Sequence, residues 1–192
     1  LVAAVSKAAA EHGYAGLTVA RIVEYAGVDR EVFDAHFDNR EQSLLAAQEV
    51  FLKRLLGEAA GACETLAPWP VRLRAGLRVV LASLVESAAL ARVLTVEADA
   101  AGLSLAERRL AGLDDFARLM RHGREDFPTP VPLPDITERL LVGGVASLLR
   151  QRLLREEPTA TPALEIELVE LLLIPYLGRE EARRVALEPP TR

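Results

Sequence analysis

The apolar residues of this chain recur with helical spacing over most of its length. Across residues 73–84 they stand at i, i+4, i+7, i+8 and i+11, which is the spacing of one face of an amphipathic helix. A similar face is formed by Leu110, Leu113, Ala117 and Met120. Aromatic residues make up only 5% of a chain that is 51% hydrophobic, and a core of Ala, Leu and Val suits packed helices better than sheets. The pattern predicts an all-α protein with about nine helices.

Residues 18–37 predict two short helices joined by a tight glycine turn. Thr18 and Asp29 are residue types that cap helix N-termini, and Gly27 between them is typical of a helix C-terminus. Apolar pairs that can close the first turn of each helix are Leu17 with Ile22 and Val28 with Phe33. This order describes a helix-turn-helix, in which the second helix enters the major groove of DNA. We therefore expect a three-helix DNA-binding domain over residues 1–48, with its first helix ended by Gly13.

Capping residues predict three further helices. One leads out of residues 1–48, and the other two lie within residues 49–192. The N-cap residues and their favourable partners are Asn39 with Gln42, Asp135 with Glu138, and Thr161 with Pro162. They predict helices from about residue 40 to 57 or 61, from 136 to about 155, and from 162 to 175 or 178. A helical second domain is therefore expected, and the Pro68-Trp69-Pro70 break marks the entry into it.

The charge distribution is unusual for a protein that binds nucleic acid. The formal net charge is −5, and residues 1–48 carry four Lys and Arg against seven Asp and Glu. DNA-reading domains usually lean toward positive charge, because neutralising phosphates supplies most of their affinity. The acidic residues therefore count against DNA binding, although the helical pattern favours it.

The sequence holds no constellation typical of an enzyme or a metal site. The three histidines (His12, His36 and His122) are isolated, and Glu-x-x-His pairs, Gly-rich phosphate loops, paired cysteines and nucleophile elbows are absent. We expect no catalytic residue, no metal and no cofactor. The single Cys63 and the absence of a signal-peptide pattern at the start predict a cytoplasmic setting, and no apolar run is long enough to span a membrane.

Five short motifs follow one another along residues 1–48. In chain order they are Gly13-Tyr14, Thr18-Val19, Ala26-Gly27-Val28, His36-Phe37 and Asn39-Arg40-Glu41. Their order and spacing resemble the tetracycline-repressor (TetR) family of bacterial transcription regulators. The resemblance implies an N-terminal DNA-binding domain and a C-terminal domain that binds a ligand and dimerises. It also implies a homodimer whose recognition helices reach successive major grooves, about 34–36 Å apart.

The resemblance further implies which residues contact DNA. Carried over position by position, they are Thr18, Arg21, Arg30, Val32, Asp34, His36 and Arg40. Glu31 and Val32 stand where many members have small or hydroxyl residues, and Asp34 stands where many have a tyrosine that bonds a phosphate. A carboxylate within about 4 Å of a phosphate is repelled by on the order of 1 kcal/mol even in water.

Three interpretations of these carboxylates remain open. Glu31 can accept a hydrogen bond from cytosine N4 and so read a base. Alternatively, Glu31 and Asp34 face solvent or pair with Arg30. In the third interpretation the acidic helix has lost DNA binding.

The last two long helices are predicted to form a dimer interface. Gly143, Gly144 and Ser147 lie inside a helix, where glycine costs stability but permits close approach of a second helix. A tight crossing within one chain would also explain them. The broad apolar faces of both helices favour a dimer, with an interface formed by Leu140, Gly143, Gly144, Ser147, Leu148, Leu168 and Leu172.

Four residues of the second domain are candidates for ligand binding. Glu97 shares an apolar face with Leu90 and Val93, so its carboxylate can orient a ligand in an apolar pocket, unless it pairs with an arginine such as Arg92 or reaches the rim. Trp69, Phe116 and Met120 are either pocket lining or plain core.

These observations predict a ligand-responsive transcriptional regulator. We expect a homodimeric repressor that binds a palindromic, double-stranded operator and is released by a small apolar effector. The alternative is a sensor or protein-interaction module on the same fold, in which the acidic helix meets a protein partner. Arginines gathered on one face, with the acids turned away, would favour DNA; acids projecting beside them would favour the partner.

Overall fold

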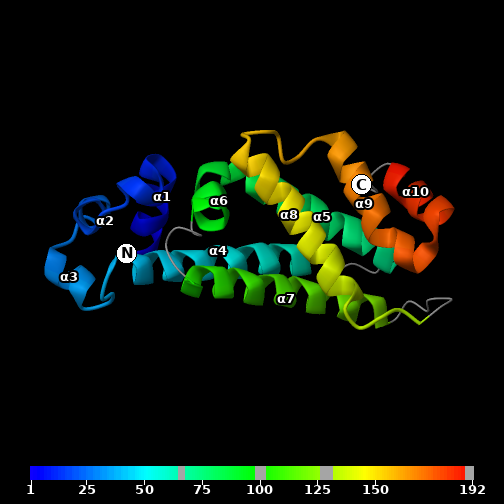
Figure 1. Cartoon of the computed structure of the whole chain (residues 1–192), viewed down its shortest axis with the longest axis horizontal. Coiled ribbons are helices and arrows are strands. Elements are labelled where there is room, and N and C mark those ends of the chain that lie inside the picture. Colours follow the sequence, from blue (N-terminus) through cyan, green and yellow to red (C-terminus); the bar gives the residue numbers. More distant parts are fainter. Residues whose placement is uncertain (65–67, 98–102, 126–131, 189–192) are drawn as a thin grey trace.

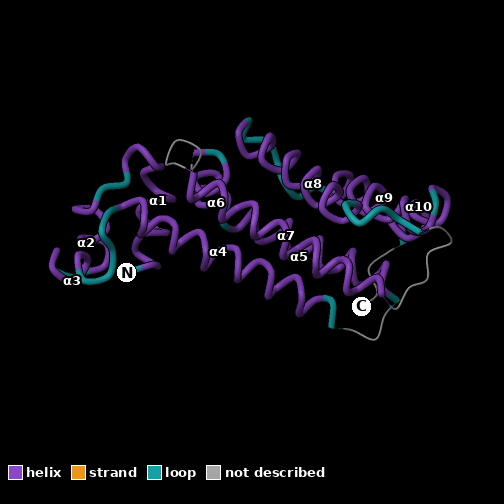
Figure 2. Tube along the Cα trace, turned by 60° about the horizontal axis from the view of Figure 1, so that its bottom comes forward, coloured by secondary structure: helices purple, strands orange, loops and turns teal. Residues whose placement is uncertain are grey.

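A computed structural model of the chain describes residues 1–64, 68–97, 103–125 and 132–188. These residues form ten helices and no strand, in an elongated arrangement with α1–α3 at one end (Figure 1, Figure 2). The helices are α1 (Val2–Gly16), α2 (Val19–Ala26), α3 (Arg30–Asp34), α4 (Arg40–Ala62), α5 (Trp69–Glu86), α6 (Ala88–Thr95), α7 (Leu103–Glu125), α8 (Thr137–Leu154), α9 (Pro162–Leu177) and α10 (Arg179–Leu187). The all-α prediction is confirmed, with one helix more than the nine expected.

The helix-turn-helix is built by the predicted caps and apolar residues. The Thr18 hydroxyl accepts a hydrogen bond from the Arg21 amide at 3.3 Å. Gly27 ends α2 with φ +64°, a left-handed conformation that glycine adopts without a side-chain clash. The three side chains Leu17, Ile22 and Phe33 are fully buried. Asp29 precedes α3 but its side chain makes no capping bond, so α3 is held by packing rather than by the predicted cap.

Helix α4 belongs to both halves of the molecule. The Asn39 side chain accepts from the Gln42 amide at 2.8 Å and starts the helix as predicted. The helix then runs for 23 residues, first against α1 and then along α5 and α7 (Figure 1). Because α4 is continuous across residue 48, the predicted domain boundary falls inside a helix. A displacement of one end of α4 therefore also displaces the other end.

The second half of the chain is a bundle in which α8 and α9 cover α5 and α7. Thr161 caps α9 through the Leu164 amide at 3.2 Å, and the helix passes through Pro175 to end before Gly178, within the predicted bounds. Helix α10, which was not predicted, packs back on α9. None of the described helices combines the length and the hydropathy needed to span a membrane.

The N-terminal end of α8 is held by a buried side-chain cluster and not by the predicted cap. The helix begins at Thr137 after Ile136 without a side-chain cap, so Asp135 does not cap it. Glu138 is instead fully buried, with its carboxylate 2.8 Å from Arg124 Nε and 3.1 Å from the Tyr176 hydroxyl that donates to it. Burial and the neighbouring carboxylate raise the pKa of the Tyr176 phenol, which keeps the donating proton in place. This cluster joins α7, α8 and α9.

An aromatic contact lies beside the same cluster. The rings of Trp69 and Tyr176 meet edge to face, with centroids 4.8 Å apart. Gly123 of α7 faces the indole so closely that a Cβ there would lie 2.6 Å from two of its ring atoms. The absence of a side chain at Gly123 therefore allows α7 to approach the start of α5.

Removing the buried carboxylate should strongly destabilise the protein. For Glu138→Ala we expect the free energy of unfolding to fall by about 3 kcal/mol, because Arg124 and Tyr176 lose their buried partner. Urea denaturation followed by circular dichroism measures this. The control Glu167→Ala removes an exposed carboxylate of α9 and should shift stability by no more than about 0.5 kcal/mol. Equal losses in both variants would contradict the assigned role of Glu138.

Adding a methyl group at Gly123 should cost stability although alanine favours helices. For Gly123→Ala we expect a net loss of about 1–2 kcal/mol, since the new Cβ forces the Trp69 ring to move. The matched substitution Gly57→Ala lies on an exposed face of α4 with open space around it. That variant should gain up to about 1 kcal/mol from helix propensity. Thermal unfolding of the two variants side by side is the measurement, and a gain at both positions would contradict the close approach.

Candidate DNA-binding surface and effector cavity

The predicted DNA-contacting residues surround α3, and most of them are exposed. Thr18, Glu31, Asp34 and His36 are all exposed, and Val32 is 40% exposed. The side chain of Phe33 alone turns inward, which fixes the face that α3 offers to the outside. The five-residue helix thus presents two acids and one valine beside its single basic residue, Arg30.

Asp34 is neutralised by its own helix. Arg30 Nε lies 3.3 Å from the Asp34 carboxylate, one turn away, and both side chains are exposed. This is the pairing that the sequence left as one of three interpretations. An exposed pair of this kind is weak, worth no more than about 1 kcal/mol, so a phosphate can compete with Asp34 for the guanidinium.

Two of the predicted basic residues are held by the scaffold. Arg40 donates to the Leu17 carbonyl at 3.0 Å and to the Glu41 carboxylate at 2.9 Å, and its guanidinium lies over the Tyr14 ring. The hydrogen bond from Arg40 lowers the pKa of Glu41 and keeps that carboxylate charged. Arg21 donates to the Gly16 carbonyl. Arg40 and Arg21 therefore fix the α1–α2 turn and the start of α4, and Arg30, whose side chain is 66% exposed, faces outward.

His36 also makes a bond within the motif. Its Nδ1 lies 2.8 Å from the Val32 carbonyl oxygen. Because a carbonyl oxygen only accepts, Nδ1 donates and therefore carries the proton. The contact ties the end of the recognition segment to α3.

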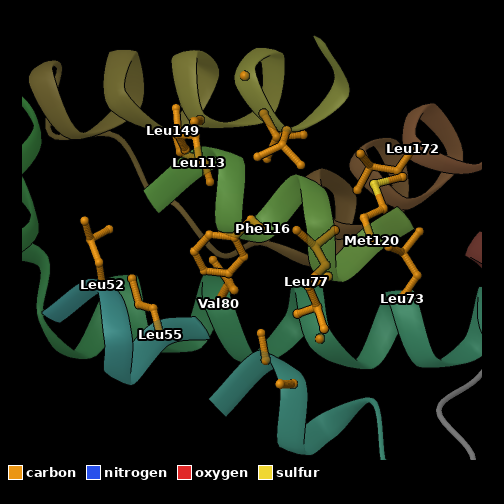
Figure 3. A pocket seen from close by; sticks show the side chains of 18 of the residues that line it. Leu52, Leu55, Leu73, Leu77, Val80, Leu113, Phe116, Met120, Leu149 and Leu172 are labelled. Carbon is orange, nitrogen blue, oxygen red and sulfur yellow. The ribbon is translucent and has the colours of Figure 1, made fainter. Parts of the chain in front are cut away.

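A large apolar cavity occupies the second half of the chain. Its volume is about 730 Å³, within the range of ligand-binding pockets. Side chains of α4, α5, α7 and α8 form its walls, and Phe116 lies near the middle of the view in Figure 3, between residues of α4 and α5 on one side and α8 on the other. Trp69, Phe116 and Met120 all line it, and their contact with a ligand stays a prediction. Cys63 is also in the wall, and burial raises the pKa of its thiol, which disfavours the reactive thiolate.

Glu97 does not line the cavity, contrary to the prediction. Its carboxylate accepts from the Tyr14 backbone amide at 2.7 Å and lies 3.3 Å from Arg92. The alternative pairing with Arg92 is therefore correct. Gly13 sits beside this carboxylate in a left-handed conformation, φ +66°, where the regular helix of α1 is interrupted. Glu97 thus links the segment after α6 directly to the helix-turn-helix domain.

The C-terminal end of α6 is where the cavity and this link meet. Arg109 of α7 and Arg150 of α8 both line the cavity, and both donate to the Thr95 carbonyl oxygen at 2.8 Å. From α4, the buried Gln48 amide donates to the Leu94 carbonyl at 3.0 Å, and its own Oε1 has no partner among the described residues. Sequence analysis missed these residues. Arg109 stands four residues before Leu113 and seven before Phe116, so it shares their apolar helix face. A cation on such a face could have indicated a polar contact inside the cavity.

The predicted dimer residues divide into two groups. On α8, Leu140, Gly144 and Ser147 are exposed and Gly143 and Leu148 are partly so. On α9, Leu168 and Leu172 are buried in the chain's own core, at 2% and 5% exposure. The structure therefore contradicts the prediction that these two leucines face a second copy of the chain. Leu171, which is 51% exposed, is the outward residue of that helix instead.

Comparison with known proteins was made for sequence and for fold. Residues 1–47 match the family model of bacterial regulatory proteins of the tetR family. No curated protein matches the sequence. Among solved structures, the fatty acid degradation regulator FadR of Bacillus halodurans has a TM-score of 0.75 at 21% identity, over 90% of this chain and 95% of that one. FadR of Bacillus subtilis in complex with stearoyl-CoA has a TM-score of 0.74 at 19% identity, over 92% and 96%.

A third similar structure extends over nearly the entire chain. SmeT, the repressor of the Stenotrophomonas maltophilia multidrug efflux pump SmeDEF, has a TM-score of 0.71 at 22% identity, over 99% of this chain and 92% of that one. Residues 1–47 therefore form a helix-turn-helix domain of the tetR family, and the chain as a whole has the fold of these solved regulators.

Proposed function

We propose that this regulator is a homodimeric repressor that binds a palindromic operator and leaves it when an apolar effector enters the cavity. The observation that carries the proposal is the physical connection between the two sites. Helix α4 runs without a break from the helix-turn-helix domain into the cavity wall, and Glu97 binds the Tyr14 amide at 2.7 Å. A ligand that prefers one arrangement of these contacts shifts the population of DNA-competent molecules.

The apolar wall of the cavity supports an effector with a large hydrocarbon surface. Leu, Val, Phe and Met side chains from α4, α5, α7 and α8 supply most of the lining. The similar FadR of Bacillus subtilis was solved with stearoyl-CoA, and SmeT is a repressor of an efflux pump. The first fact favours an effector with a long hydrocarbon chain, and the second favours a repressor.

The outer face of α8 and α9 supports a dimer. Leu140 is 65% exposed and Leu171 is 51% exposed. One helical turn along α8 from Leu140, Gly144 has open space where a side chain would stand, so nothing within the described protomer fills this site. Exposed leucines around a small residue are what a second copy of these helices would cover.

A protein partner in place of DNA is the second candidate. The exposed carboxylate of Glu31 and the 40% exposed Val32 favour it, since neither helps to bind a phosphate backbone. Against it, the Arg30–Asp34 pair masks one of the two α3 acids. The exposure of Glu31 beside Arg30 meets the criterion for a protein partner, but the match of residues 1–47 to the tetR family model favours DNA, and we propose that Glu31 reads a base.

Binding to operator DNA is tested by fluorescence anisotropy with the region upstream of the protein's own gene. We expect sequence-dependent binding that weakens as salt rises. Arg30→Ala should lower the affinity and flatten the salt dependence, because a phosphate contact is lost. Asp34→Asn should raise the affinity by roughly fivefold, since Arg30 is released from a pair worth about 1 kcal/mol and becomes available to a phosphate.

The control for these variants is Glu180→Gln on α10, which changes one exposed carboxylate far from the motif. Its affinity should match that of the wild type. Absence of salt-sensitive, sequence-dependent binding at every protein concentration would remove the DNA model in favour of a protein partner.

Dimerisation through α8 and α9 is tested by introducing a charge at the exposed glycine. Gly144→Arg should convert the dimer to a monomer, because a buried, unpaired guanidinium costs several kcal/mol at an interface. Size-exclusion chromatography with light scattering measures the mass. The control Leu103→Arg places the same charge at an exposed position of α7 and should stay dimeric. A dimer that survives Gly144→Arg would exclude this face.

A further inference from the structure

Arg72 of α5 is a cation of the cavity wall that has few partners in the protein. Its guanidinium makes one hydrogen bond to the described residues, a long one of 3.4 Å from Nη2 to the Gly123 carbonyl oxygen. Its Nε is buried and has no acceptor among these residues. Nη1 also lacks an acceptor there but is not sealed off, so a ligand can reach it. A partly buried charge without a counter-charge costs free energy, which an anion in the cavity would recover.

The neighbours of Arg72 in the wall do not neutralise it. Cys63 Sγ lies 3.4 Å from the Arg72 carbonyl oxygen, and burial raises the pKa of its thiol, so the sulfur stays neutral. The side chain of Glu64 is exposed to solvent and forms no ion pair with Arg72 in the described chain. His122 lies 3.3 Å from Glu125, a carboxylate of its own helix. The positive charge of Arg72 is therefore left for a ligand.

Arg72 marks the end of the cavity that lies away from the helix-turn-helix domain. It stands near the start of α5, and that helix runs back from there toward α6 (Figure 1). In Figure 3, Leu73 and Met120 lie at one end of the cavity and Leu52 at the other. The wall continues to Thr95, the last residue of α6. A ligand held at Arg72 would thus place the rest of its length along apolar walls that lead to α6.

The charge of this site favours a carboxylate. Hydrogen bonds from a guanidinium to a carboxylate are about twice as strong as those between neutral groups. A carboxylate carries one negative charge and matches the single guanidinium. A phosphate monoester carries about −1.5 to −2 charges near pH 7, and the excess would lie beside apolar walls, where an unpaired charge is costly. A neutral head group would gain only an ordinary hydrogen bond.

We propose that the effector is a carboxylate-headed amphiphile, whose head group binds Arg72 and whose hydrocarbon chain lies along the cavity toward α6. The proposal rests on the effector role of the cavity proposed above and specifies the chemistry and the direction of its ligand. The head group is held at the remote end of the bundle. The end of the chain points toward the helix that is followed by Glu97, which binds the Tyr14 amide of the DNA-binding domain.

The protein contains its own reporter for a test that does not depend on DNA. Trp69 is the single tryptophan of the chain, and it lines the cavity beside Gly123, whose carbonyl accepts the Arg72 hydrogen bond. Its fluorescence is titrated with decanoate, the neutral methyl decanoate and decyl phosphate, each below its solubility limit and critical micelle concentration. Calorimetry provides a second measurement. We expect decanoate to bind about tenfold or more tightly than its methyl ester, and more tightly than decyl phosphate.

Variants assign the preference to Arg72. Arg72→Met should lower the affinity for decanoate to that for methyl decanoate, and unchanged binding of the ester shows that the cavity is intact. Arg72→Lys keeps a charge and should keep part of the preference. The control Arg118→Met removes an arginine of α7 whose side chain is 66% exposed and does not line the cavity. That variant should keep the whole preference.

Four results would overturn the proposal: equal binding of decanoate and its ester by the wild type, a preference that survives Arg72→Met, tighter binding of decyl phosphate than of decanoate, or no binding of decanoate in either measurement. The outcome is separable from that of the proposed function. A protein that failed to bind operator DNA in the anisotropy experiment would still report its head-group preference through Trp69. Conversely, binding of both probes without a preference would remove the carboxylate and leave the apolar effector in place.

Discussion

The C-terminal end of α6 is the constraint on which the rest of this structure depends. The last carbonyl groups of a helix have no partner within the helix and must be satisfied from elsewhere. Here Gln48 of α4 binds the Leu94 carbonyl, and Arg109 of α7 and Arg150 of α8 bind the Thr95 carbonyl. Three walls of the bundle are therefore tied to one helix end. Because Glu97 follows immediately and binds Tyr14, the same helix end also sets the position of the helix-turn-helix domain.

On the candidate DNA-binding surface, the arginines that could bind phosphates already make contacts within the protein. Of three arginines in the motif region, Arg40 and Arg21 are engaged with backbone carbonyls of the α1–α2 turn. Arg30 is shared with Asp34. The domain therefore has little spare positive charge for phosphates, so its discrimination must come from shape and from the few exposed side chains of α3.

Local signals predicted the fold well, and long-range contacts account for what they missed. Thr18, Asn39 and Thr161 cap their helices as expected because capping depends on neighbours three residues away. Glu138 was misread as a cap partner, since its burial depends on Arg124 and Tyr176, which are distant in sequence. Helix α9 is apolar on nearly every side, so its sequence could not show whether Leu168, Leu172 or Leu171 faces outward. The common contact of Arg109 and Arg150 with the Thr95 carbonyl likewise requires α7 and α8 to be in place together.

Gln48 gives this arrangement a thermodynamic asymmetry. Its side chain is almost completely buried, and while its amide nitrogen binds Leu94, its Oε1 accepts no hydrogen bond from the described residues. A buried acceptor without a donor costs about 1–3 kcal/mol. Any relative shift of α4 and α6 that brings a donor to this oxygen recovers that free energy. A ligand-bound arrangement that supplied such a donor would gain that free energy, and an effector would need correspondingly less differential affinity to reach it.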